Sequence, residues 1–176
     1  MTDKGPEPFA TNIEVATLAN TAFRDTLWTG KYLQLTVMSI PPGGVVGGEI
    51  HDDHDQFIRV ESGKAKVVMG PRKDDITFDE TVGDDWIALI PAGKFHNIIN
   101  VGDDDLKLYS LYGPAEHLPG TRHETFADAA RSWDRAMPCG TSLNQLGGEH
   151  CTHPSAAAFQ VSFLIRGPSD RICQPP

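Results

Sequence analysis

Short runs of alternating apolar and polar residues follow one another from about residue 23 to residue 112. Successive side chains of a strand point to opposite faces, so such runs predict strands with one buried face. Turn residues, such as Pro41-Pro42-Gly43-Gly44, separate the runs. The expected strands are 23–28, 31–40, 56–60, 65–69, 76–80, 86–90, 97–101 and 106–112. Many short strands with no long helical period between them predict an all-β sandwich or barrel.

The segments on either side of this region have a different pattern. Residues 1–11 are polar, contain Pro and Gly, and are expected to form a flexible lead-in. Residues 125–137 predict a helix that Thr125 would cap, and 159–165 predict a last strand. The 176 residues fit one domain. Its expected parts are a lead-in over 1–22, a barrel over 23–113, and a loop, short helix and irregular tail over 114–176, packed on or near the barrel.

Side chains able to bind a metal lie within this pattern. Glu49 and His51 are two residues apart, so on an extended segment both point to one face. Gln56 shares a face with Ile58 and Val60, the more apolar face of its strand, and is expected to point into the barrel. A buried amide needs a partner, and coordination of a metal through its carbonyl oxygen would supply one.

A second motif lies further along the chain. It reads Pro91-Ala-Gly93-Lys-Phe-His96, followed after three residues by Asn100. Pro91 and Gly93 predict a tight turn, and His96 would begin the strand that leaves it. The histidine therefore enters the expected barrel from a different strand than Gln56 does.

Together the two motifs resemble those of the cupin family, over about residues 30–113. The second motif matches the family pattern fully. The first motif of the family is a Gly, five residues, His-x-His, a Glu, six residues and a Gly. Here the spacing from Gly43 to Gly63 matches, but Glu49 replaces the first His and Gln56 replaces the Glu. The Glu-x-His…Asp-Gln-Phe run also resembles small bacterial single-domain cupins.

The resemblance implies a double-stranded β-helix, a jelly-roll barrel, with one divalent metal ion held by Glu49, His51, Gln56 and His96. Two imidazoles and two oxygen donors suit Mn, Fe, Ni, Co or Zn better than Ca or Mg. The usual three His and one Glu bring one negative charge, and so do these four residues. The two replacements therefore cancel in formal charge, as expected of a working variant site.

His54 and Asp55 are alternative ligands. His54 lies three residues from His51 and would face the opposite way on a strand, and its three Asp neighbours predict an exposed turn. Asp55 is one residue out of register with Gln56. A metal-free cupin, in which the motif residues are only structural, is a further alternative.

Other residues are weaker candidates for a role. Gln34, Thr36 and Met38 alternate on one strand and would line the barrel or lie on the sheet surface. His117 and His123 follow the barrel, in a loop that would cover its mouth. A zinc site in the tail would use Cys139, His150, Cys151 and His153, but their spacing matches no common zinc module.

Two function classes fit these features. The first is a metalloenzyme of isomerase, lyase or dioxygenase type acting on a small oxygen-rich organic molecule. The candidates for its general base are Glu49 and a histidine of the loop after the barrel. The second is a non-catalytic cupin that binds or senses a small molecule. The family resemblance also implies a homodimer.

Composition narrows the set of partners. The formal net charge is −9, with 24 acidic and 15 basic residues, so nucleic acid and anionic membranes would be repelled. No apolar stretch reaches the length of about 18 residues that a membrane span needs. The N-terminus lacks the apolar core of a signal peptide, so a cytoplasmic location is expected.

Overall fold

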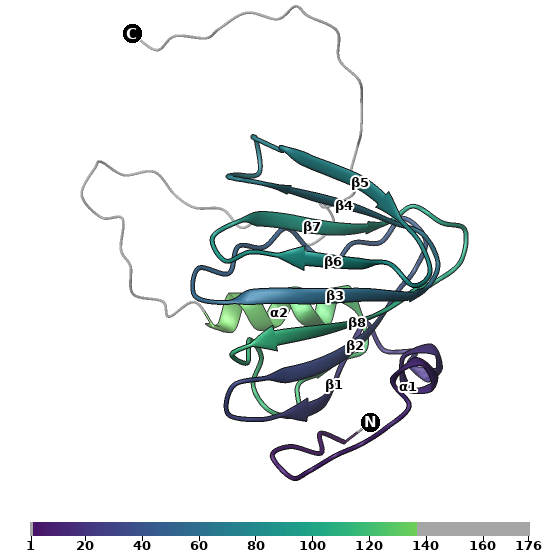
Figure 1. Ribbon diagram of the computed structural model, residues 1–176, viewed down its shortest axis with the longest axis vertical. Coiled ribbons are helices and arrows are strands. Elements are labelled where there is room, and N and C mark those ends of the chain that lie inside the picture. The colour runs from purple at the N-terminus through teal and green to yellow at the C-terminus, as the bar shows by residue number, and fades with distance from the viewer. Residues whose placement is uncertain (1, 137–176) are drawn as a thin grey trace, which may run out of the picture. The chain divides into compact units, whose positions relative to one another are not determined.

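Two antiparallel sheets form the strand-rich part of the computed structural model, which describes residues 2–136 (Figure 1). In chain order the strands are β1 (Arg24–Thr29), β2 (Gln34–Ile40), β3 (Asp55–Ser62), β4 (Ala65–Gly70), β5 (Phe78–Val82), β6 (Ile87–Ile90), β7 (Phe95–Asn100), β8 (Leu106–Gly113) and β9 (Arg122–His123). The helices are α1 (Ile13–Ala19) and α2 (Phe126–Ala136). The predicted all-β fold with a short helix after the barrel is confirmed.

The strand order brings distant parts of the sequence together. One sheet has six strands in the order β6-β3-β8-β2-β1-β9, and the other has three in the order β5-β4-β7. Strand β8 thus lies between β2 and β3, which precede it by many residues. Isolated bridges of Val45 with Ile99 and of Glu49 with His96 link the segment after β2 to β7. This connection places the first motif directly against the second.

The inward face of the larger sheet changes from apolar to polar along the strands. On β8, Leu106 and Leu108 are fully buried, and they are followed on the same face by Ser110 and Tyr112. The cross-strand partners on β2 follow the same order: Ile40, Met38, Thr36 and Gln34. The apolar end forms the core, where each buried aliphatic side chain contributes about 1.5–3 kcal/mol. The polar end is where a ligand can be held.

The lead-in is more ordered than the sequence suggested. Helix α1 was not predicted; Asn12 caps it by accepting from the Val15 amide. Its apolar residues give no core-facing stripe, because Val15 and Leu18 are 62% and 43% exposed. The stretch before α1 pairs with β1, since the Lys4 amide donates to the Leu27 carbonyl at 2.9 Å. Residues 2–11 thus contact β1, which the expectation of a flexible lead-in over 1–11 did not include.

Helix α2 matches its prediction closely. Thr125 precedes it, and its Oγ1 accepts from the Asp128 amide at 3.3 Å while Asp128 Oδ2 accepts from the Thr125 amide at 2.9 Å. This reciprocal pair satisfies two amides at the start of the helix. Neither described helix has the length and apolar character needed to cross a membrane. The predicted strand 159–165 and the Cys and His set of the tail lie outside the described residues.

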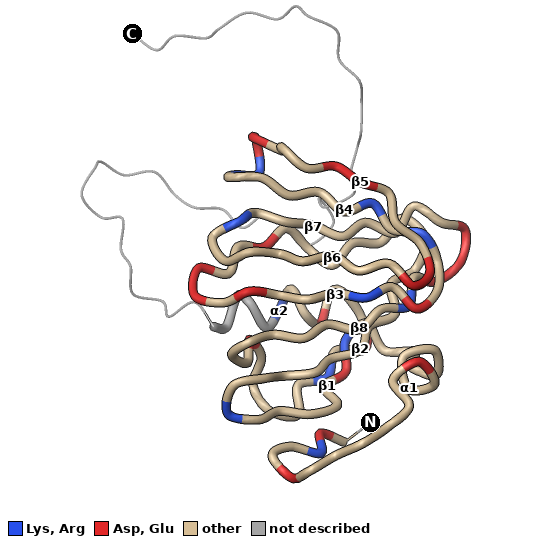
Figure 2. Tube along the Cα trace, in the orientation of Figure 1, with Lys and Arg blue, Asp and Glu red and all other residues tan. Residues whose placement is uncertain are grey.

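Charged side chains are distributed unevenly over this part of the chain. Asp and Glu group in several loops at the strand ends, whereas Lys and Arg are scattered (Figure 2). One arginine, Arg24, differs from the rest because it begins β1 and its side chain is fully buried.

Candidate metal centre

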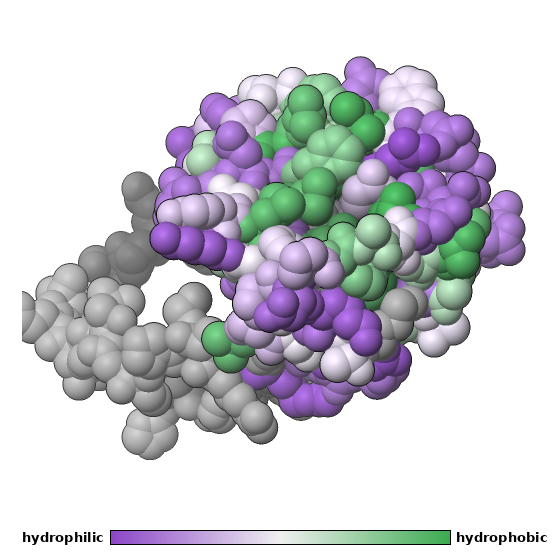
Figure 3. All heavy atoms as spheres, turned by 60° about the horizontal axis from the view of Figure 1, so that its bottom comes forward, coloured by the Kyte–Doolittle hydropathy of each residue, from purple (hydrophilic) through white to green (hydrophobic). Residues whose placement is uncertain are grey.

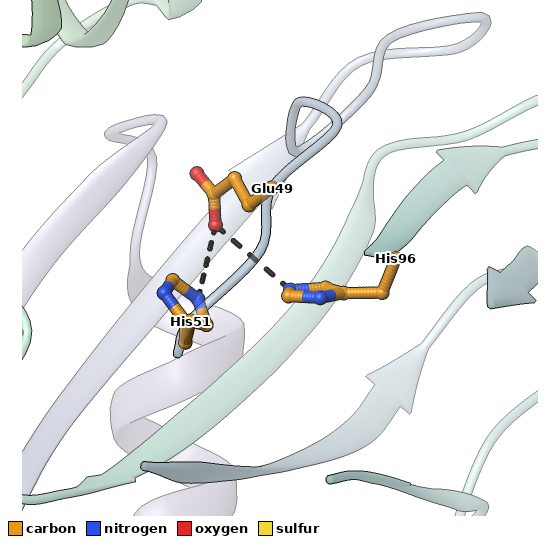
Figure 4. A group of neighbouring side chains, drawn as sticks. All are labelled: Glu49, His51 and His96. Atoms are coloured by element: carbon orange, nitrogen blue, oxygen red, sulfur yellow. Dashed lines mark ion pairs between the residues drawn. The ribbon is translucent and has the colours of Figure 1, made fainter. Parts of the chain in front are cut away.

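Glu49, His51 and His96 converge at the polar end of the barrel (Figure 4). The backbones of Glu49 and His96 hold each other through two hydrogen bonds of 3.0 Å, which fixes both side chains relative to β7. Glu49 Oε2 lies 3.4 Å from His51 Nε2 and 4.0 Å from His96 Nε2. The predicted convergence of Glu49 and His51 is present, although their segment forms only this one bridge instead of a full strand.

Both imidazoles present the same nitrogen to the centre of this group. His96 Nδ1 lies 3.1 Å from the Lys94 carbonyl oxygen and can only donate to it, so Nε2 carries the lone pair. His51 Nδ1 faces Glu116 Oε2 at 3.6 Å, which favours the same tautomer. A carbonyl or carboxylate on the far nitrogen is the usual support of a metal-binding histidine.

Gln56 is also buried, and its amide orientation follows from its neighbours. Ser110 Oγ donates to the Phe57 carbonyl at 3.2 Å, so it accepts from Gln56 Nε2 at 2.8 Å. The other end of the amide, Oε1, is buried and has no hydrogen-bond partner among the described residues. Gln56 pairs with Tyr112 on β8, and the Tyr112 ring lies 5.9 Å from that of His51.

A divalent ion fits this set of residues. The atoms Glu49 Oε2, His51 Nε2, Gln56 Oε1 and His96 Nε2 are all buried, and none has a hydrogen-bond partner within residues 2–136. In the tautomers above, each of these four atoms carries a lone pair and none carries a hydrogen. They therefore cannot satisfy one another by hydrogen bonds. The set has two nitrogen and two oxygen donors, and only the Glu49 carboxylate is charged. Such a set suits a first-row transition metal.

The pKa values of the two histidines move in opposite directions. At His51, burial lowers the pKa, but the Glu49 carboxylate, with Glu116, raises it by more, so the net shift is upward. At His96, burial is the largest effect and the pKa falls below its ordinary value. The lowered pKa favours the neutral form of His96, which is the form that binds a metal.

His54 does not lie in an exposed turn, contrary to the prediction. It is 5% exposed, and its ring stacks on that of His51 with centroids 4.6 Å apart. Its Nδ1 pairs with Asp53, and its Nε2 lies 3.4 Å from Glu116 Oε2. Packing against Tyr112, whose ring lies 6.0 Å away, overrides the solvation of the three neighbouring carboxylates.

His51, His54 and Glu116 form a second group with metal-binding atoms. The two groups share His51 but use different nitrogens: Nε2 faces Glu49, and Nδ1 faces Glu116. One imidazole cannot present a lone pair on both nitrogens while neutral. The two groups are therefore alternatives, or Glu116 serves as the acceptor that orients His51.

A turn of the second motif connects the two halves of the site. Gly93 has a φ of 73°, a conformation that favours glycine, and its amide donates to the His51 carbonyl at 2.7 Å. Asp55 Oδ1 accepts from the Ala92 amide at 2.8 Å in the same turn. Asp55 thus supports the turn, and it is Gln56 that is buried.

Several further polar residues lie at the barrel end, and two of them, Arg24 and Tyr112, were not singled out from the sequence. Buried atoms without a hydrogen-bond partner in the described chain occur in Arg24 (Nε and both Nη), Thr36 (Oγ1), Tyr112 (Oη), His117 (Nε2) and His123 (Nδ1). Thr36, His117 and His123 were weak candidates. Arg24 and Tyr112 stand on predicted strands, where only the parity of their positions could have indicated an inward side chain.

Gln34, a weak candidate for lining the barrel, instead holds the segment after β8. Its Oε1 accepts from the His117 amide at 2.9 Å, and its Nε2 donates to the His117 carbonyl at 2.8 Å. This pair of bonds fixes the loop that carries Glu116. The His117 ring meets that of Tyr112 edge-on at 5.2 Å, so the loop does cover the polar end of the barrel, as expected.

Comparison with known proteins agrees with this architecture. The family model for the cupin domain matches residues 36–112, which include all four predicted ligands. A stretch of 132 residues is 50% identical to the uncharacterized protein YrkC of Bacillus subtilis (strain 168), covering 75% of this chain and 71% of YrkC. The chain belongs to the cupin superfamily.

Two other matches extend over most of the described part. The crystal structure of BH2720 from Bacillus halodurans has a TM-score of 0.74 and 53% sequence identity, covering 74% of this chain and 99% of that one. The uncharacterized protein L612 of Acanthamoeba polyphaga mimivirus is 39% identical over 113 residues, 64% of this chain and 69% of L612.

Proposed function

We propose that the protein is a metal-binding cupin that holds one divalent ion of Mn, Fe, Ni, Co or Zn through Glu49 Oε2, His51 Nε2, Gln56 Oε1 and His96 Nε2. The observation that supports it is the set of four buried donor atoms without hydrogen-bond partners in the described chain. Leaving such atoms unpaired costs about 1–3 kcal/mol each, and a bound cation removes that cost.

We further propose that the protein is an enzyme acting on a small oxygen-rich organic molecule, of isomerase, lyase or dioxygenase type. A bound ion would supply Lewis acidity toward a substrate oxygen and, if it is iron, redox chemistry. The chain itself would contribute Glu49 as a candidate base and the buried donors of the barrel end as positioning groups. The alternative is a cupin that binds or senses the same molecule without turnover.

The first test measures metal content by mass spectrometry in the wild type and in single variants. We expect about one equivalent of a first-row metal in the wild type, and loss of most of it in His96→Ala and His51→Ala. His123→Ala is the matched control, since His123 is a buried histidine of the same barrel outside both metal-binding groups. It should retain the metal.

The His54→Ala variant distinguishes the two groups of ligands. If Glu49, His51, Gln56 and His96 hold the ion, His54→Ala retains it. Loss of metal in His54→Ala, with retention in His96→Ala, would instead assign the ion to His51, His54 and Glu116. A wild type without metal after reconstitution would overturn the proposal.

The expected partners belong to the same proposal. The net charge of −9 supports a small-molecule ligand over nucleic acid or an anionic membrane. A cytoplasmic location stays the prediction made from the sequence. A homodimer, which the family resemblance implies, is proposed as well.

A further inference from the structure

Arg24 is a fully buried arginine whose guanidinium makes no hydrogen bond to residues 2–136. Its relative exposure is 0%, and none of its three guanidinium nitrogens has a hydrogen-bond partner in the described part of the chain. Glu49 Oε1 lies 3.9 Å from Arg24 Nη2, an ion-pair distance that is too long for a hydrogen bond. Arginine stays protonated in proteins, so five N–H donors and a positive charge are left inside the barrel.

Further polar groups surround this guanidinium. Arg24 pairs across the sheet with His123 on one side and with Met38 on the other, and Thr36 follows Met38 on the same face of β2. Burial raises the pKa of Tyr112, although the nearby charge of Arg24 acts to lower it. Tyr112 therefore stays a neutral hydroxyl that can donate. Four different strands thus direct unpaired polar atoms toward one region.

The net charge of this region is positive once a divalent ion is bound, which favours a negatively charged ligand. Arg24 and Glu49 cancel each other, and a divalent ion at the proposed centre would leave the interior at about +2. Glu116, at the more exposed edge, reduces this to about +1. Positive charge enclosed in a barrel is costly unless a ligand balances it. The ligand is thus expected to carry one or two negative charges.

Glu49 lies between the two groups that would bind the ligand, which are the proposed metal ion and the Arg24 guanidinium. Its Oε2 faces the histidine nitrogens and its Oε1 faces Arg24, so the proposed metal position and the guanidinium lie on opposite sides of one carboxylate group. A ligand that spans them needs an oxygen for the metal and an anionic group next to it. The planar guanidinium donates two parallel hydrogen bonds to a carboxylate.

We propose that Arg24 binds the carboxylate of a small organic acid whose neighbouring hydroxyl, carbonyl or carboxyl oxygen reaches the ion held by Glu49, His51, Gln56 and His96. The metal end of this inference rests on the proposed function; the Arg24 end does not. Tyr112 and Thr36 would then donate to the acid or to its neighbouring oxygen.

The test uses a matched pair of ligands in calorimetric titrations of the metal-loaded full chain. Lactate and propane-1,2-diol share a hydroxyl and a methyl group, and only lactate has a carboxylate; oxalate and inorganic phosphate complete the panel. We expect lactate or oxalate to bind and the diol to bind at least about 30-fold more weakly. Equal binding of lactate and diol, tighter binding of phosphate, or no binding of either acid would overturn the inference.

Variants of Arg24 provide the second arm. Arg24→Gln should retain one equivalent of metal but lose acid binding by about 30-fold or more, and Arg24→Lys should recover part of it because the charge is restored. Unchanged acid binding in Arg24→Gln would contradict the inference. If Arg24→Gln does not fold, two other comparisons still test the inference. They are acid binding by Arg24→Lys against the wild type, and binding of lactate against propane-1,2-diol.

Metal-free protein separates this inference from the proposed function. Thermal stabilisation by oxalate is measured with chelator-treated wild type and Arg24→Lys. Because Arg24 itself binds the acid, a weaker stabilisation that depends on Arg24 should remain without metal. If the wild type binds no metal but oxalate still stabilises it through Arg24, the metal centre is rejected and the anion site is retained. If oxalate does not stabilise the metal-free protein, and the metal-loaded Arg24 variants bind the acid as the wild type does, the anion site is rejected.

Discussion

At the scale of single residues, the proposed ligands are oriented by hydrogen bonds with neighbouring residues. Lys94, which follows the turn of the second motif, orients His96 through its carbonyl, and Ser110 orients Gln56 through its hydroxyl. Neither Lys94 nor Ser110 is one of the proposed ligands. The identity of a ligand can therefore change while its position is kept, which is how Glu49 and Gln56 can stand where other cupins have His and Glu.

Exchange of the amide for a carboxylate tests the role of Gln56. We expect Gln56→Glu to retain the metal and to tighten its binding by about tenfold or more, because a charged oxygen replaces a neutral one beside a dication. Ser110 can rotate its hydroxyl to donate to the new oxygen. Competition with a chelator measures the affinity. Gln56→Leu, which has no donor, should weaken it, and unchanged affinity in both variants would show that Gln56 does not bind the ion.

His117 makes stability depend on pH. Burial, assisted by the charge of Arg24, lowers the pKa of His117 to about 2. Below about pH 6.5 the unfolded chain binds a proton at this histidine and the folded chain does not, so the free energy of unfolding falls as pH falls. The fall due to His117 should be somewhat less than about 1.4 kcal/mol per pH unit between pH 6 and 5.

The comparison variant for this effect is His117→Gln. Urea unfolding of metal-free protein at pH 7.5, 6.5 and 5.0 should show a shallower loss of stability in His117→Gln than in the wild type. The contribution of His51, whose pKa is raised, is common to both proteins and cancels in the difference. Parallel curves for the two proteins would contradict the burial of a neutral His117.

At the scale of elements, the turn before β7 is held by one glycine conformation. Gly93 has a positive φ of 73°, and a Cβ there would meet nothing within 4 Å, so an added methyl would suffer only backbone strain. We expect Gly93→Ala to lower the free energy of unfolding by about 1 kcal/mol in urea denaturation. Gly83→Ala is the control, because its Cβ would have only an ordinary contact at 3.8 Å. Equal losses would refute the role of the conformation.

The segment after β8 depends on Gln34. Gln34→Leu removes both hydrogen bonds to the His117 backbone and leaves an amide and a carbonyl without them. We expect a stability loss of about 1–3 kcal/mol and faster hydrogen exchange in peptides covering 114–121. Peptides from β4, in the other sheet, should exchange as in the wild type. Unchanged protection of 114–121 would show that other contacts hold the loop.

At the scale of the whole molecule, an apolar row crosses the outer face of the larger sheet. Leu89, Phe57, Leu111 and Leu35 are cross-strand partners on four successive strands, and Leu89 is 63% exposed. Apolar side chains also gather in the middle of the face shown in Figure 3. Strand β6, which carries Leu89, is the edge of its sheet. We propose that a second copy of the chain packs its own outer face on this row and so covers it.

Light scattering after gel filtration tests this dimer. The wild type should have twice the mass of the chain, and Leu89→Asp should shift it to the monomer by placing a charge in the interface. Leu118→Asp is the control, since Leu118 is 81% exposed on the loop after β8 and lies outside the row. A monomeric wild type, or a dimer unaffected by Leu89→Asp, would contradict the proposed interface.

The strand pattern and the four candidate ligands could be predicted from the sequence because their determinants are local. Alternation along a strand decides which side chains share a face, and the Pro91–Gly93 turn decides where His96 enters. Helix α1 could not be predicted, because its exposed Val15 and Leu18 produce no buried stripe. His54 was misplaced because its three Asp neighbours suggested solvent, whereas the rings of His51 and Tyr112 enclose it.

Spacing within short segments was therefore enough to predict the barrel, its two motifs and the convergence of Glu49, His51 and His96, whereas metal binding by these residues and by Gln56 stays a prediction. Only the tertiary structure decided what lies around them. Arg24 comes from β1 and Glu116 from the loop after β8, and both reach the centre through strand pairings between distant parts of the chain. Burial of a charge depends on which strands meet, and no local pattern records that.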